Sequence, residues 1–280
     1  MTGYVPSDNS RAIRAGASTG TGTPAARPAV SAPPRRVRRE WAALAAPTVA
    51  PARFDPHMTD GLPSPVRRWL AHAVAPGAPL LQTVVLVTHG EIRMGTWRRF
   101  RAHQVLAPPR GLVWVAGSRL GGLPVSGFDR YSGGTGEMRW RLLRAVPVMS
   151  GSGPDITRSA AGRLACEFPL VPPVALGPAV CWEPVDDRQA VAHVRIGQEE
   201  FAVTMRVSPS GRLESVAMLR WGNPDRHGYG EHPFGAVFEG ESHFGGFTLP
   251  RTVRAGWWFG TERWREGEFI RFALDEAAHH

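Results

Sequence analysis

The chain has 280 residues, 42% of them hydrophobic, which allows one large domain or two small ones with a sizeable core. Its formal net charge of +9 comes from arginine alone, because the sequence contains no lysine. Chemistry that needs a lysine Schiff base is therefore excluded, as are the ordinary P-loop nucleotidases with their Walker A lysine.

The two cysteines, Cys166 and Cys181, are too few for a metal cage or a disulfide framework, and we expect two buried free thiols. No apolar run approaches the roughly 18 residues of a membrane span, and the N-terminus has no apolar signal-peptide core. The sequence therefore predicts a cytoplasmic protein with no membrane span, no metal and no cofactor.

Residues 1–40 are rich in Gly, Ala, Pro, Ser, Thr and Arg, without apolar periodicity, and predict a disordered arm. The basic run at Arg35–Glu40 is either a solvated tail or a contact for nucleic acid or an anionic surface. We assign residues 41–59 to a linker with a short helix at Trp41–Ala46. A second helix is expected at Pro63–Val74, with Val66 and Leu70 on its apolar face.

From residue 83 the apolar period changes to two, which is typical of strands. In Glu137–Leu143, for example, Met138, Trp140 and Leu142 alternate with charged residues. The strands expected before the next helix are Thr83–His89, Ile92–Ala107 (a long strand or a hairpin), Leu112–Ala116, Val125–Tyr131 and Glu137–Leu143.

The stretch from Ser152 to Leu176 predicts the clearest helix. Ser152 and Asp155 have the spacing of a capping box, and Pro169 ends the pattern. Glu167 falls at the edge of the apolar arc, with Arg163 one turn earlier, so this helix should lie half-buried over a sheet. The arc comprises Ile156, Ala160, Ala161, Leu164 and Phe168.

Strands recur after Pro178, and the turns between them are short, which favours an antiparallel sheet. Two helices are too few to cover both faces of that sheet, so one domain over residues 60–277 fits best. The later strands are expected at Val180–Glu183, Ala190–Ile196, Glu200–Val207, Arg212–Trp221, Phe234–His243, Gly246–Phe259 and Phe269–Leu274.

The order of motifs over about residues 60–275 resembles an uncharacterised bacterial domain family that is abundant in actinobacteria. That family is in turn similar to the lipoprotein carriers of the periplasm. The resemblance implies an α+β, mainly β fold: a strongly curved antiparallel half-barrel sheet wrapped over one or two helices, with an apolar cavity between them. The motifs are LPSPVRRWLAHAV (62–74), W-x-x-F-x-A-x-Q (97–104), GLVWVA (111–116), FDRYSGGTGEMRW (128–140), GPDITRSAAGRLACEFPLVPPVAL (153–176), VCWEPVDD (180–187) and FGGFTLPRTVRAGWW (244–258).

Glu167 is the sharpest candidate for chemistry. A carboxyl group at the edge of an apolar arc suits a general acid or base, whereas a structural ion pair with Arg163 explains the same position. Asp129 and Tyr131 should point to one face of their strand. With Arg139 on the neighbouring strand they form either a polar patch in a pocket or a surface pair.

His103 and Gln104 lie on opposite faces of their strand, so one of them should point inward. The tryptophans on strands are core residues or flat walls of a ligand cavity. We count as candidate ligand-binding residues Trp97, Gln104, Trp114, Tyr131, Arg139, Trp140, Arg163, Trp182, Trp221 and Trp257.

Two functions remain open for the cavity, besides a structural or nucleic-acid-associated role through the arginine-rich arm. The first is a module that binds a hydrophobic small molecule, lipid-like or polyketide-like, without nucleic acid as a partner. The second is a cofactor-independent enzyme (cyclase, isomerase, dehydratase or hydrolase) that uses Glu167, His103 or Asp129 as acid and base in the same cavity.

Overall fold

The computed structural model describes residues 32–280, and within this range 13 strands form a single antiparallel sheet. In strands such as β8 and β10, the alternation of apolar and polar residues gives a buried face and a more exposed one, whereas β3 is buried on both faces over its first eight residues. The strands are β1 (Val84–Met94), β2 (Thr96–Ala107), β3 (Gly111–Leu120), β4 (Leu123–Ser132), β5 (Thr135–Leu142), β6 (Val146–Ser152), β7 (Val180–Pro184), β8 (Gln189–Ile196), β9 (Glu199–Val207), β10 (Leu213–Gly222), β11 (Gly230–Phe244), β12 (Phe247–Trp257) and β13 (Glu268–His279).

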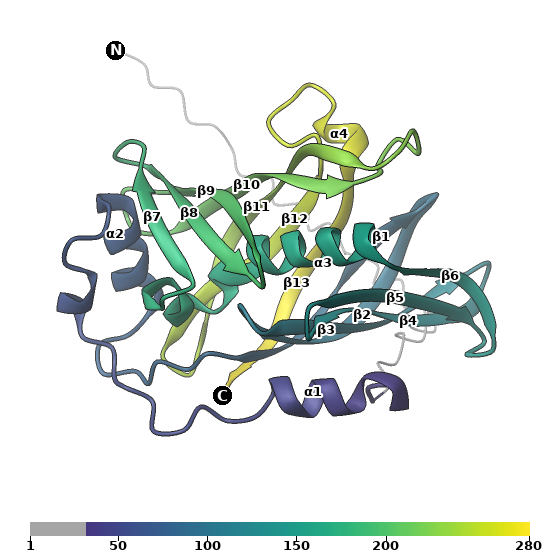
Figure 1. The fold of residues 1–280 in the computed structure, drawn as a ribbon, viewed down its shortest axis with the longest axis horizontal. Helices are drawn as coiled ribbons and strands as arrows, with labels where there is room; N and C mark the ends of the chain where they lie inside the picture. The colour runs from purple at the N-terminus through teal and green to yellow at the C-terminus, as the bar shows by residue number, and fades with distance from the viewer. Residues whose placement is uncertain (1–31) are drawn as a thin grey trace, which may run out of the picture.

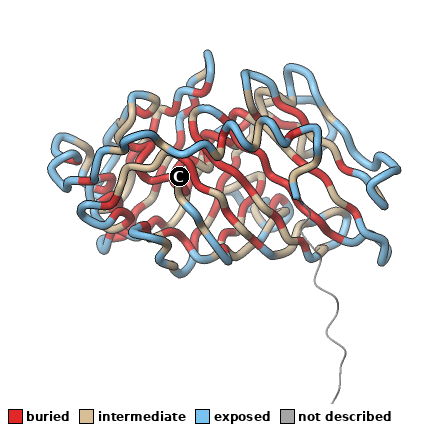
Figure 2. The backbone as a smooth tube through the Cα atoms, turned by 90° about the horizontal axis from the view of Figure 1, so that it is seen from below, coloured by how far each residue is buried: buried red, intermediate tan, exposed pale blue. Residues whose placement is uncertain are grey.

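The sheet consists of two meanders that meet at its middle. Its order is β6-β5-β4-β3-β2-β1-β13-β12-β11-β10-β9-β8-β7, so the pairing of β1 with β13 joins the two halves. The sheet curls into a half-barrel (Figure 1), which confirms the predicted fold class. Buried residues run through the middle of the strands, and exposed ones gather at the turns (Figure 2).

One segment connects the two edges of the sheet. Between β6 and β7 the chain forms α3 (Pro154–Glu167) and two short 3-10 helices, η3 (Phe168–Leu170) and η4 (Pro172–Leu176). Since β6 and β7 lie at opposite ends of the strand order, this connection has to cross the concave face. α3 packs against β5 and β4 on one side and against β10 on the other (Figure 1).

The start of α3 differs from the predicted capping box. Ser152 is the last residue of β6, and the N-cap is Gly153, whose φ of 101° favours glycine. No side chain caps the helix, and Pro154 in the first turn fixes a helical φ instead. The helix ends at Glu167, just before the predicted stop at Pro169.

Two other helices cover the sheet near the N-terminus. α2 (Ser64–Ala73) matches the predicted helix and packs Trp69 and Leu70 into the main core. α1 (Arg38–Leu44) follows a 3-10 turn, η1 (Arg35–Val37), and packs against β2 and β3. Val37 and Leu44 are buried there in a second, smaller core. Part of the segment predicted as an arm is thus helical, and residues 1–31 of that arm lie outside the described range.

The remaining differences concern short elements. Ile92–Ala107 is a hairpin whose turn is at Gly95, with a φ of 75°. The strand β6 and the short helices η2 (Pro56–Thr59) and α4 (Trp264–Gly267) were not predicted. No helix within residues 32–280 is long and apolar enough to cross a membrane.

Candidate functional site

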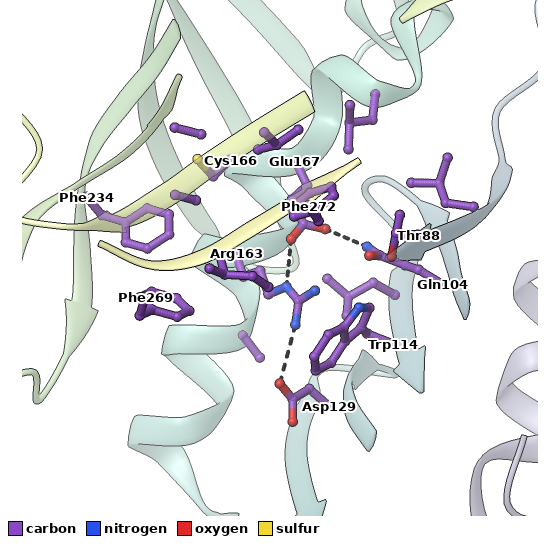
Figure 3. Close-up of a pocket in the computed structure, with 18 of the residues that line it drawn as sticks. Thr88, Gln104, Trp114, Asp129, Arg163, Cys166, Glu167, Phe234, Phe269 and Phe272 are labelled. Carbon is purple, nitrogen blue, oxygen red and sulfur yellow. Dashed lines mark hydrogen bonds and ion pairs between the residues drawn. The ribbon is translucent and has the colours of Figure 1, made fainter. Parts of the chain in front are cut away.

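A cavity of about 200 Å³ lies between α3 and the concave face of the sheet (Figure 3). Strands from both meanders and the inner side of α3 contribute its walls, and most of the side chains are aliphatic or aromatic. The apolar lining comprises Leu86, Ile92, Phe100, Leu112, Trp114, Met138, Ile156, Ala160, Leu170, Val216, Phe234, Ala236, Phe238, Val253, Ala255, Phe269, Ile270 and Phe272.

Polar side chains meet at one side of the cavity, around Arg163. Its Nε donates to Oε1 of Glu167 at 2.7 Å, and its Nη1 donates to Oδ2 of Asp129 at 3.4 Å (Figure 3). Gln104 on β2 donates its amide to Oε2 of Glu167. The cluster therefore joins α3 to two strands of the first meander, β2 and β4.

Two tryptophans complete this cluster. Trp140 donates its indole N–H to Oδ1 of Asp129 at 3.1 Å, and the guanidinium of Arg163 lies over the ring of Trp114, 5.2 Å from its centroid. All four carboxylate oxygens of Asp129 and Glu167 thus accept a hydrogen bond from a protein donor. Such a closed network favours a structural role for both carboxylates.

Burial raises the pKa of Asp129 above its ordinary value, and the positive charge of Arg163 opposes this shift. Burial by itself would lower the pKa of Arg163, but Glu167 and Asp129 together raise it above its usual range. The cation at this position is therefore well compensated by its neighbours.

A second arginine, Arg220 of β10, also lines the cavity and is only 8% exposed. Its Nε donates to the backbone oxygen of Ser159 at 3.2 Å, and its Nη2 donates to the hydroxyl of Ser159 at 3.4 Å. The guanidinium lies 4.5 Å from the ring centroid of Phe234 and 5.3 Å from that of Trp257. Burial, with a contribution from Arg163, lowers its pKa to about 10, so it remains a cation at neutral pH.

Cys166 of α3 lines the cavity as well. Burial raises the pKa of its thiol to about 12, which keeps it protonated and makes it a poor nucleophile. Both cysteines are free, but Cys181 is exposed, contrary to the expectation of two buried thiols.

The structure brings five of the predicted site residues to the cavity wall. They come from β2, β3, β4 and α3, and are Gln104, Trp114, Asp129, Arg163 and Glu167. Of the pair His103 and Gln104, the glutamine points inward. His103 does not line the cavity. Burial lowers the pKa of its imidazole, the charge of Glu276 raises it, and the charge of Arg101 lowers it further.

Several aromatic candidates lie near the cavity or away from it. Trp140 and Trp257 do not line the cavity but contact polar groups that do. Trp140 donates a hydrogen bond to Asp129, and the ring of Trp257 lies beside the guanidinium of Arg220. Trp182 packs against Trp69 and Phe168 in the main core.

Trp221 donates its indole N–H to Asp155 at 2.8 Å, outside the cavity. Trp97 lies beside two arginines. Its ring centroid is 4.4 Å from the guanidinium carbon of Arg271 and 6.0 Å from that of Arg93. Neither tryptophan forms part of the cavity wall.

Tyr131 and Arg139 do not form a patch with Asp129 at the cavity. Tyr131 is buried in the main core, beyond the cavity wall. Arg139 is paired in register with Phe128, one residue before Asp129, and so belongs to the opposite face of the sheet. It forms an ion pair with Glu137 there.

Sequence reasoning missed Arg220, and it expected phenylalanines in the cavity wall without identifying which ones. A signal for Arg220 was present, because strict alternation along β10 places it on the same face as Val216 and Met218. Leu219, between Met218 and Arg220, points outward and is 60% exposed. The strand thus buries a charge and exposes a leucine, which is the reverse of the usual preference.

Within the described part of the chain, no group of three or more His, Cys, Asp or Glu side chains is arranged to hold a metal ion. The alternating Glu239, Glu241 and His243 face separate partners. Glu241 lies 2.8 Å from His72, and His243 contacts Thr248.

A protein-family model described as "Family of unknown function (DUF6544)" matches residues 52–269. Similar solved structures include a LolA superfamily protein from Nitrosomonas europaea, with 9% identity over 78% of this chain and 92% of that chain and a TM-score of 0.42. A putative outer membrane lipoprotein-sorting protein domain from Vibrio parahaemolyticus has 7% identity over 71% of this chain and 85% of that chain, with a TM-score of 0.38. The comparison with curated proteins gave no match. The family match confirms the expected resemblance to an uncharacterised domain family, whereas the actinobacterial origin stays a prediction.

Proposed function

We propose a binding function for this chain, which belongs to the DUF6544 family of proteins of unknown function: it encloses a hydrophobic small molecule between α3 and the concave face of the sheet. The ligand is lipid-like or polyketide-like. The observation that carries the proposal is the cavity itself, whose walls are mostly apolar, with Arg163 and Arg220 among the polar side chains that line it.

The size of the cavity supports this proposal. A cavity of roughly 150 Å³ lined by aliphatic and aromatic side chains stays free of water and binds benzene. The cavity here measures about 200 Å³, so it accommodates an apolar group somewhat larger than a benzene ring. A ligand that fills such a space also stabilises the folded chain, since it binds the native state alone.

The alternative of acid–base catalysis has less support. Both carboxylates of the site are engaged by protein donors, His103 is outside the cavity, and the Cys166 thiol is protonated. A general base has to lie within hydrogen-bond reach of the proton that it removes, and each of these carboxylate oxygens is instead directed at a protein donor. The catalytic roles of Glu167, His103 and Asp129, and the cytoplasmic location, stay predictions from the sequence.

Calorimetric titration with 1-octanol, a short apolar probe, tests the binding function. We expect saturable binding by the wild-type chain and its loss in Ala236→Phe, because the added ring occupies the cavity. The matched control is Leu219→Phe, which adds a ring on the outer face of β10 and should leave binding unchanged. Equal affinity in all three proteins would place the probe outside the cavity and contradict the proposal.

A further inference from the structure

The charges of Arg163 and Arg220, two of the arginines that line the cavity, are balanced very differently. Arg163 has two carboxylates within 4.0 Å, those of Glu167 and Asp129. Arg220 has none: no carboxylate oxygen of residues 32–280 lies within 4.0 Å of its guanidinium. Its only hydrogen-bond partners in that range are the two oxygens of Ser159.

Arg220 also retains unused donors. A guanidinium carries five N–H groups, and Ser159 accepts from two of them, which leaves three without a protein acceptor in the described chain. A buried charge is costly unless it is paired and fully hydrogen-bonded. An arginine that is 8% exposed, borders a mostly apolar cavity and has no carboxylate of the described chain within 4.0 Å is thus a group that a ligand can complete.

The neighbouring helix is adapted to this arginine. A Cβ atom added at Gly162 of α3 would lie 3.3 Å from Cγ of Arg220, which is closer than most side chains tolerate. Glycine at this position therefore lets α3 pass over the aliphatic part of the arginine side chain. The rings of Phe234 and Trp257 flank the guanidinium, and together these contacts hold it in place beside the cavity.

We propose that the ligand is an amphiphile with a carboxylate, which pairs with the guanidinium of Arg220 while its apolar part fills the cavity. This inference rests on the proposed binding function and adds the charge of the ligand to it. A carboxylate matches the planar fork of a guanidinium and accepts two parallel N–H bonds. Asp129 and Glu167 do not compete for this position, because both are bound to Arg163.

The test compares three eight-carbon probes that differ only in their head group: octanoate, 1-octanol and octylamine. Their affinities for the wild-type chain are measured by calorimetric titration near neutral pH. We expect octanoate to bind at least about tenfold more tightly than 1-octanol, because it supplies the missing charge partner, and octylamine to bind most weakly.

Variants then assign the preference to Arg220. Arg220→Gln should lower the affinity for octanoate at least about tenfold and leave that for 1-octanol within about threefold, whereas Arg220→Lys should retain part of the preference. The control is Arg158→Gln on the outer side of α3, which removes ion pairs with Glu199 and Glu231 and should not change any of the affinities.

Each outcome decides between the two claims. If 1-octanol binds as tightly as octanoate to the wild-type chain, the carboxylate inference is wrong and the binding function stands. If none of the three probes binds, the binding function itself fails. Should Arg220→Gln not fold, the wild-type comparison of the head groups still decides the inference.

Discussion

Arg163 and Glu167, one turn apart on α3, form an ion pair of 2.7 Å. The same carboxylate accepts a hydrogen bond from Gln104 of β2, so the pair connects the helix to the sheet. A structural ion pair was one of the two explanations that the sequence offered for Glu167, and this geometry agrees with it. The pair thus holds α3 in place above the cavity.

Replacing Glu167 by glutamine should destabilise the protein by about 1–3 kcal/mol, because it removes the charge partner of Arg163 and alters the bond to Gln104. The free energy of unfolding in urea measures this effect. Glu231→Gln breaks an ion pair whose carboxylate side chain is 48% exposed, and it should cost less than about 1 kcal/mol. Equal effects of the two substitutions would show that the inner pair has no special role.

The pH dependence of stability should reveal the partly buried carboxyl group of Asp129. Its pKa is raised in the folded chain above the ordinary value of 3.8, so the folded state holds the proton more tightly than the unfolded state does. The stability from this group is present below pH 3.8 and is lost as the pH rises through the folded-state pKa.

In the Asp129→Asn variant the side chain at this position cannot ionise, so the variant does not lose this stability as the pH rises. The free energy of unfolding of the variant, relative to the wild type, should therefore increase from about pH 4 to about pH 7. Urea denaturation at a series of pH values measures the difference. A relative stability that decreases over this range would mean that Arg163 outweighs burial at this site.

The helix α1 should contribute to the stability of the whole domain. Leu44 is 5% exposed and belongs to the smaller core with Val105, Val113 and Phe128. Leu44→Ala should reduce the free energy of unfolding by about 2–3 kcal/mol, as expected for a large-to-small change in a core. Val49→Ala, at a residue that is 91% exposed, provides the comparison and should have almost no effect. If both variants unfold like the wild type, α1 is dispensable for the fold.

The contact between β5 and α3 depends on Gly136. A Cβ atom there would lie 2.7 Å from Cα of Thr157 and 2.8 Å from the backbone oxygen of Ile156, and neither of these atoms can move without the helix. Gly136→Ala should therefore cost about 1–3 kcal/mol and weaken the binding of octanoate.

Gly230→Ala is the matched control for this substitution, because its nearest neighbour, a side-chain atom of His232, is 3.5 Å away. Thermal unfolding and calorimetric titration of both variants provide the measurements. If the octanoate affinity is unchanged in Gly136→Ala, ligand binding does not depend on the position of α3, and the prediction is wrong.

Much of the fold followed from local patterns. The alternation in Glu137–Leu143 and the helical arc with Arg163 and Glu167 are short-range signals, and the structure contains both elements close to the predicted bounds. The start of α3 was misplaced, because Ser152 has the spacing of a capping box but is still hydrogen-bonded in a strand. Spacing alone does not show whether a residue is already paired with a neighbour.

The site was harder to predict, since its composition depends on pairing between distant strands. Alternation separated His103 from Gln104 but did not show which of the two points inward. It placed Arg220 on one face with Met218, yet only the topology shows that this face borders the cavity. For the same reason the tryptophans, which look equivalent in the sequence, are divided between the core, the surroundings of the cavity and the outside.

The pairing of β1 with β13 has a consequence for how the chain assembles. Val84 lies opposite His279, so the seam between the two meanders joins the first strand of the sheet to the last one in the sequence. Each meander is built from neighbouring hairpins and can form early, whereas the seam requires closure of a very long loop and should form last. Loss of the final dozen residues during synthesis would remove β13, divide the hydrogen-bonded sheet at its centre and leave α3 as the element that contacts both halves.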